Sequence, residues 1–228
     1  MAIADASSHP HTLVYTICHA RGMLDICRGR TEGMRSYAGM AVALSTEHGF
    51  PFWRAGGQIF EGWAATCEGQ VDQGLEILEQ GLCAWRSTGA RLWLPIFLSL
   101  KAQAYAKAGR SDAALQAIDE AIDISAETNE RWAIAEVLRI KARLLTAVGH
   151  SGFDEMETLL VDSLEIARDQ KAHSWELRSA CDLAFLWFKH GRREAAVKLL
   201  QASYHQFTEG YETPDLKYAR ALLDGRFA

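Results

Sequence analysis

The sequence contains few prolines and none of the short motifs that mark common enzymes. Its 228 residues include only four prolines, which are Pro10, Pro51, Pro95 and Pro214. Each lies in a predicted connection or near a predicted helix start, where its missing N–H costs little, so none interrupts a helix. The patterns H-E-x-x-H, G-x-S-x-G and G-x-x-x-x-G-K-[ST] are all missing. We therefore expect no enzymatic activity and no cofactor.

Cysteine and histidine are present, but not at the spacings typical of disulfide or metal-binding proteins. The five cysteines are odd in number, lack a C-x-x-C pair and fall in helix-like segments: Cys18, Cys27, Cys67, Cys83 and Cys181. This usage indicates packed, reduced thiols in a cytoplasmic protein. His9 and His11 are closely spaced, but the two further ligands that a zinc ion needs are not nearby in the sequence, so we expect no metal site.

Excess positive charge and long apolar runs are also missing. The formal net charge is −5, so there is no general attraction to nucleic-acid phosphates or anionic lipid. No uninterrupted apolar run reaches the roughly 18 residues of a membrane-spanning helix, and the N-terminus lacks the basic and apolar regions of a secretion signal. We therefore expect a cytoplasmic protein that contacts neither nucleic acid nor membrane.

Glycine, by contrast, is placed with a regular period. Five glycines end helix-like runs and lie 40, 40, 40 and 42 residues apart: Gly29, Gly69, Gly109, Gly149 and Gly191. Glycine suits the residue after a helix because it adopts positive φ without a Cβ clash. The series therefore predicts five helix hairpins.

Two further columns of the repeat admit only small residues. One lies seven residues before each glycine of the series: Gly22, Gly62, Ala102, Ala142 and Ala184. The other lies in the second helix of each hairpin: Ala41, Gly81, Ala121, Ser163 and Ser203. Helices that cross closely need small residues at the crossing point, so both columns indicate paired helices.

These observations predict an all-α, right-handed solenoid that forms one domain over residues 1–228. Its hairpins span about 11–50, 51–90, 91–130, 131–172 and 173–211. A capping helix over about 213–224 begins with Thr213 as N-cap and Pro214 as the first helical residue. No similar polar cover precedes the first hairpin, so we expect it to dock on another copy, as in a homodimer, or to continue a longer array.

Tryptophan marks the joints between the predicted hairpins. Trp53, Trp93, Trp132 and Trp175 share one position near the start of each first helix, which favours packing against the preceding hairpin. Trp63 differs because it follows the small residue Gly62 and falls on the predicted inner face. For Trp63, packing and partner binding are both open.

The predicted inner face supplies the candidate partner-binding residues, which become more basic toward the C-terminus. They are Ile59, Trp63, Ile96 and Gln103 in the second and third hairpins, and Arg139, Arg143, Arg178, Phe185 and Lys189 in the fourth and fifth. Several cations on one strip would suit a peptide or ligand that bears a carboxylate. The alternative is that the arginines pair with acids such as Glu136 and Glu176 on neighbouring turns.

The stretch "LSLKAQAYAKAGRSDAALQAIDEAIDI" resembles the tetratricopeptide repeat, at a longer period of 40 residues. Three longer stretches, among them "FPFWRAGGQIFEGWAATCEGQVDQGLEILEQGLCAWRSTGA", resemble the C-terminal helical arm of bacterial signalling proteins that join a class III nucleotide cyclase to a signal-transduction ATPase. The resemblance implies a non-catalytic interaction and regulatory arm that binds a protein, a peptide or another domain of the same polypeptide. Small-molecule sensing by the arm is the alternative function.

Overall fold

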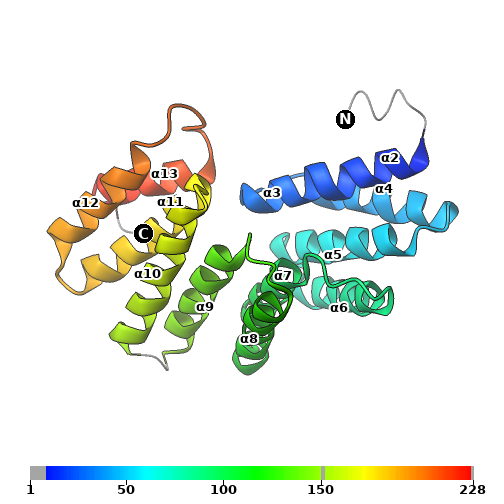
Figure 1. Ribbon diagram of the computed structural model, residues 1–228, viewed down its shortest axis with the longest axis horizontal. Coiled ribbons are helices and arrows are strands. Elements are labelled where there is room, and N and C mark those ends of the chain that lie inside the picture. Colours follow the sequence, from blue (N-terminus) through cyan, green and yellow to red (C-terminus); the bar gives the residue numbers. More distant parts are fainter. Residues whose placement is uncertain (1–8, 150–151, 227–228) are drawn as a thin grey trace. The chain divides into compact units, whose positions relative to one another are not determined.

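The computed structural model describes residues 9–149 and 152–226, and these residues contain helices and no strands (Figure 1). In chain order the elements are α2 (Pro10–Tyr15), the π-helical η1 (Thr16–Gly22), α3 (Met23–Cys27), α4 (Met34–Glu47), α5 (Pro51–Cys67), α6 (Val71–Ser87), α7 (Leu94–Lys107), α8 (Ser111–Thr128), α9 (Ile134–Val148), α10 (Phe153–Asp169), α11 (His173–Lys189), α12 (Arg193–Tyr204) and α13 (Pro214–Leu223). In the described ranges, no helix is both long enough and apolar enough to cross a membrane.

The predicted fold class is confirmed: tetratricopeptide-like helix hairpins are followed by a capping helix. Each predicted hairpin contains one helix pair. The first differs because α2, η1 and α3 follow one another as a single broken helix that pairs with α4. The sequence pattern did not predict the π-helical turn of η1.

The chain divides into two compact units, Met1–Ala117 and Ile118–Ala228. In the first unit, α5 packs against α4 on one side and α6 on the other, around buried side chains that include Phe60, Trp85 and Phe97. In the second unit, α10 packs between α9 and α11, while α13 lies on α11 and α12. A single domain over residues 1–228 stays a prediction, and its first eight residues lie outside the described ranges.

The glycine period marks helix ends, as predicted. All five glycines of the series have positive φ, between 64° and 91°. The structure adds a second series of left-handed residues at the joints between hairpins: Gly49, Gly89, Asn129 and Lys171, with φ of 70°, 80°, 54° and 55°. Residues other than glycine disfavour positive φ, so at Asn129 and Lys171 the turn between hairpins imposes a backbone conformation that these residue types do not prefer.

All ten small residues of the two columns are buried, as their predicted role in close helix packing requires. A Cβ atom added to Gly62 would lie 2.5 Å from the backbone nitrogen of Leu78 and 2.6 Å from the carbonyl oxygen of Gly74. The backbones of α5 and α6 are therefore in direct contact at this crossing, and no side chain larger than hydrogen fits there.

The joint tryptophans pack against the preceding hairpin in three of the four cases. Trp53 contacts the ring of Tyr15 edge-on at 5.6 Å, and Trp93 stacks on Trp85 at 5.9 Å. Trp175 lies 5.7 Å from Trp132. The sequence prediction is therefore confirmed for Trp53, Trp93 and Trp175.

The capping helix α13 begins as predicted, with Thr213 before it and Pro214 as its first residue. Its buried face consists of Leu216, Ala219 and Leu222. The Thr213 side chain makes no capping hydrogen bond, so the attachment of α13 depends on this apolar face and on the ion pair described below.

Candidate functional site

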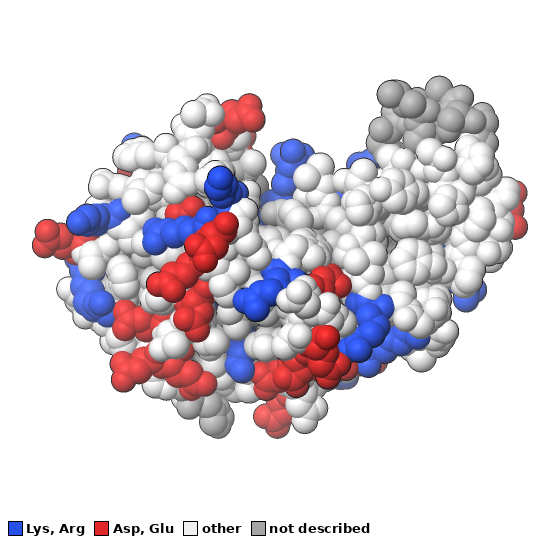
Figure 2. Space-filling view, viewed as in Figure 1, with Lys and Arg blue, Asp and Glu red and all other residues white. Residues whose placement is uncertain are grey.

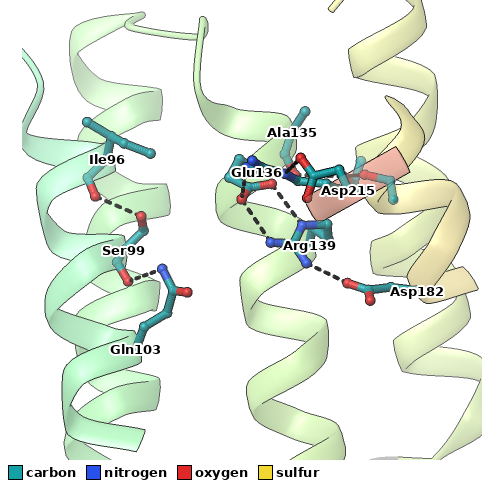
Figure 3. Close-up of polar contacts among 11 residues, drawn as sticks. Ile96, Ser99, Gln103, Ala135, Glu136, Arg139, Asp182 and Asp215 are labelled. Carbon is teal, nitrogen blue, oxygen red and sulfur yellow. Dashed lines mark hydrogen bonds and ion pairs between the residues drawn. The ribbon is translucent and has the colours of Figure 1, made fainter. Parts of the chain in front are cut away.

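The candidates in the first unit are largely core residues. Ile59 is 0% exposed and Ile96 is 1% exposed, so both side chains are packed in the core, and this structure gives no support to their predicted role in partner binding. Both lie on faces of α5 and α7 that the helix packing covers. Trp63 is also nearly buried, while Gln103 is half-buried and donates from its side chain to the Ser99 carbonyl at 3.2 Å (Figure 3).

In the second unit, Arg139 is the centre of a buried ion-pair network. Its Nε and Nη2 atoms each donate to a carboxylate oxygen of Glu136 at 2.8 Å, and its Nη1 atom donates to Asp182 at 2.6 Å (Figure 3). The pair with Glu136 lies within α9, and the bond to Asp182 joins α9 to α11. This bidentate geometry suits the planar guanidinium group and fixes the side chain of Arg139.

Arg178 extends the network to the terminal helix. It donates to Glu136 at 3.0 Å and, through Nε, to Asp215 of α13 at 2.8 Å. The alternative that the arginines of this strip pair with acids such as Glu136 is therefore confirmed for Arg139 and Arg178, but not for Arg143. Glu176, the other acid of that alternative, accepts from Arg168 at 3.1 Å. Three carboxylates thus neutralise two guanidinium groups, which removes most of the charge that the sequence pattern assigned to this strip.

Burial and charge act in opposite directions on the network. Burial alone would raise the pKa of the Glu136 carboxyl group, but the guanidinium groups of Arg139 and Arg178 outweigh it and lower the pKa to about 2. Burial likewise opposes the charged form of Arg139, and the carboxylates of Glu136 and Asp182 raise its pKa instead. Both shifts favour the charged forms, so Glu136 and Arg139 are ionised at neutral pH.

The ion pairs also set the register of α9 against α11. Glu136 meets Arg178, and Arg139, one turn further along α9, meets Asp182, one turn further along α11. The two helices therefore run parallel, and the next turn places Arg143 of α9 level with Phe185 of α11.

Arg143, Phe185 and Lys189 form the exposed continuation of this helix face, which we call the basic strip. Arg143 and Lys189 are exposed and Phe185 is half-buried. The Lys189 ammonium group lies 4.5 Å from the centre of the Phe185 ring. Among residues 9–149 and 152–226, neither Arg143 nor Lys189 forms an ion pair. The strip thus combines two unneutralised cations with one aromatic ring.

Neither unit presents a metal centre in its described residues, because no three His, Cys, Asp or Glu side chains gather there at coordinating distance. Of the closely spaced histidines, His11 accepts a hydrogen bond from the indole of Trp53 at 3.0 Å. His9 accepts a weak bond of 3.4 Å from the backbone nitrogen of Thr12 at the start of α2.

Sequence reasoning missed the acids that complete the network. Asp182 and Asp215 lie 43 and 37 residues from the arginines that they bind. A signal was present, since Asp182 follows Arg139 by about one repeat, and residues one repeat apart on first helices are neighbours in such arrays. The residues of one helix face do not reveal this pairing, because the acids that neutralise its arginines lie on neighbouring helices.

Comparisons with known proteins place the fold and leave the family open. No protein-family profile matches the sequence. An uncharacterised protein of Rhizobium meliloti, R02095, is 24% identical over 197 residues, which are 86% of this chain but only 18% of that protein. The chain therefore spans less than a fifth of the length of this relative.

Several solved structures share the fold at low sequence identity. BtubC from P. vanneervenii matches with a TM-score of 0.66 and 17% identity, over 86% of this chain and 89% of its own. A Rap protein complexed with competence and sporulation factor matches with a TM-score of 0.65 and 12% identity, over 95% of this chain and 64% of its own. A putative kinesin light chain of Podosopora anserina with tetratricopeptide-like repeats has a TM-score of 0.56 and 20% identity, over 94% of this chain and 98% of its own. The chain is thus similar to tetratricopeptide-like helical proteins in fold.

Proposed function

We propose that this chain is a non-catalytic interaction module that binds a peptide segment or a neighbouring domain on the basic strip of its second unit. The observation that carries the proposal is the contrast along one helix face. Arg139 and Arg178 are buried and neutralised, whereas Arg143 and Lys189 remain exposed beside Phe185. Buried pairs hold the helices together, and the exposed cations are available to a partner.

The charge of the second unit indicates what kind of partner would fit. Acidic and basic side chains are interspersed over the visible surface of α10 to α12 (Figure 2), so an approaching carboxylate is repelled at many positions. Within the described part of the chain, the basic strip offers two cations with no acid paired to them, and an aromatic ring for apolar contact. A segment with a carboxylate next to an apolar side chain complements this arrangement.

The wider role that we propose is that of a regulatory arm in a larger bacterial signalling protein, such as a cyclase-linked signal-transduction ATPase. Two observations support it. The relative in Rhizobium meliloti is more than five times as long as the matched segment, as expected for an arm of a larger polypeptide. The Rap structure, similar in fold, is a complex with competence and sporulation factor, so a fold of this kind can carry ligand recognition in that protein.

Site-specific photo-crosslinking tests the proposal because it captures whatever contacts a chosen side chain. The reactive amino acid p-benzoylphenylalanine would replace Phe185 in the full polypeptide in its own cells, and adducts would be identified by mass spectrometry. The same amino acid at Thr158, an exposed residue of α10, serves as the control. We expect a distinct adduct at position 185 that is missing at 158 and is lost when Arg143→Glu is added. Equal adducts at both positions, or none at either, would contradict the proposal.

A further inference from the structure

The first helix presents a surface unlike the rest of the molecule. Residues 9–20, "HPHTLVYTICHA", contain no Asp, Glu, Lys or Arg, and Figure 2 shows an almost uncharged face over α2 and α5. Exposed positions along this helix are occupied by rings, among them His11, Tyr15 and His19. The first helix is therefore attached to its neighbours by aromatic and hydrogen-bonding contacts in place of ion pairs.

One hydrogen bond at this surface has a fixed direction. The indole Nε1 of Trp53 lies 3.0 Å from Nε2 of His11. Indole nitrogen is a donor only, so His11 must accept through an unprotonated Nε2 and carry its single proton on Nδ1. The neutral imidazole makes this bond, and the imidazolium ion cannot, because both of its nitrogens are donors.

The other contacts of His11 are uncharged. Its ring meets Phe50 and Trp53 edge-on, with ring centres 5.2 and 6.0 Å apart. The titratable or charged groups on the elements around it are His9 and Tyr15 of the same helical region, Cys18, His19 and Arg21 of η1, Arg35, Tyr37 and Glu47 of α4, His48 of the following turn, and Arg54, Glu61 and Cys67 of α5. Within residues 9–149, none of these groups forms an ion pair or a hydrogen bond with His11. The nearest acid in this turn, Glu47, pairs with His48 at 4.0 Å.

We propose that His11 and Trp53 form a proton-sensitive latch that holds α2 against the start of α5. Because the docked state makes its hydrogen bond only with neutral His11, uptake of a proton by this ring breaks the bond. We therefore expect docking to weaken on acidification, since histidine is the side chain that ordinarily changes charge between pH 5 and 8. Among residues 9–149, no carboxylate forms an ion pair with His11, and Glu47 pairs with His48 instead.

Opening of the latch would loosen more than one hydrogen bond. Tyr15 contacts the Trp53 ring edge-on, with ring centres 5.6 Å apart. Val14 and Ile17, on the buried side of the same broken helix, are fully buried. His19 is a second histidine on this helix, and it stacks on Tyr15 and on Trp93 with ring centres 5.0 Å apart in each case. A measurement that follows only total stability would mix these two histidines, so the test must be local.

The indole N–H of Trp53 supplies that local reading. Its signal in a proton–nitrogen NMR spectrum is assigned by its loss in Trp53→Phe. In the wild type we expect this signal to shift between pH 7.5 and pH 5.5. We also expect amide exchange in residues 13–19, corrected for intrinsic rates, to accelerate by about threefold to tenfold, the range given by one hydrogen bond of ordinary strength. His11→Gln keeps a neutral acceptor and should remove both pH dependences, whereas His19→Gln should leave the Trp53 shift in place.

Two results would overturn the latch. One is a Trp53 signal and exchange pattern that do not change over this pH range in the wild type. The other is an equal change in the wild type and in His11→Gln, which would assign the pH response to another group. If the chain loses structure below pH 6, as judged by circular dichroism, the Trp53 shift between pH 7.5 and 6 still decides between these outcomes.

Discussion

Arg178 and Asp215 form an ion pair of 2.8 Å that joins the terminal helix α13 to α11. Arg178 is nearly buried and also donates to Glu136, so a single guanidinium group connects α13, α11 and α9. The apolar face of α13 is short, with three buried side chains. The ion pair therefore specifies where along α11 the terminal helix rests, while the apolar contacts hold it there.

Removal of the Asp215 charge should loosen α13. We expect Asp215→Asn to lower the free energy of unfolding by about 1–2 kcal/mol, because a charge-assisted hydrogen bond is lost and Arg178 keeps only part of its neutralisation. Urea unfolding measures the loss, and amide exchange should show that it is concentrated in residues 214–223. Glu212→Gln is the matched control, since its carboxylate is exposed and pairs with the exposed Lys217 at 2.8 Å. An equal loss in the control would disprove a specific role for Asp215.

Glu136 should matter more than any other acid of the network, since it lies between two guanidinium groups. Glu136→Gln leaves Arg139 and Arg178 buried with reduced compensation, and we expect a loss of about 3 kcal/mol or more. The charged form of Glu136 is favoured by folding because its pKa is lowered to about 2 from the ordinary 4.5. Its contribution is therefore complete above pH 4.5 and is lost as the pH falls toward 2.

Urea unfolding at several pH values tests both parts of this prediction. Between pH 5 and pH 3, the unfolding free energy of the wild type should fall more steeply than that of Glu136→Gln. Parallel pH dependences in the two proteins would show that Glu136 does not carry the acid sensitivity.

The features that the sequence predicts well are those that repeat. The third hairpin has Gly109 at the end of its first helix and the small residue Ala102 seven residues earlier. A glycine and a small residue recur at the equivalent positions of the other hairpins, because each helix end and each helix crossing imposes the same local requirement. The period therefore predicts the hairpins and their small-residue contacts without any long-range information.

Features that depend on one particular neighbour were not predictable in this way. Arg139 lies on the predicted inner strip, yet its partner Asp182 comes from the next first helix and changes an expected binding residue into a structural one. The bond between His11 and Trp53 joins residues 42 apart and is visible only once α2 lies beside α5. Periodicity in the sequence indicates which face of its helix a residue occupies. Which side chain on another helix it contacts can be seen only from the packed structure.

Lys171 offers a test of backbone strain at a joint. Its φ is 55°, and the equivalent joints of the first two hairpins have glycine, Gly49 and Gly89, at similarly positive φ. Lys171→Gly should raise the free energy of unfolding by roughly 1 kcal/mol, because glycine adopts this conformation without the Cβ clash. Lys171→Ala retains the Cβ atom and should give no such gain, which separates relief of strain from loss of the lysine charge. Thermal and urea unfolding of the three proteins provide the comparison.

Gly62 and Gly39 test whether a glycine is needed for a close helix crossing. Alanine at position 62 would place Cβ 2.5 Å from the Leu78 nitrogen, and because this neighbour is backbone, α5 and α6 must move apart. We expect Gly62→Ala to destabilise the first unit by about 2–3 kcal/mol. Gly39 also lies inside a helix, but a Cβ there meets nothing within 4 Å, so Gly39→Ala should stabilise by about 0.5–1 kcal/mol through helix propensity alone. Urea unfolding of both variants measures these changes. A lower free energy of unfolding for Gly62→Ala and a higher one for Gly39→Ala would indicate close backbone contact at Gly62, whereas changes of the same sign would indicate a general effect of glycine replacement.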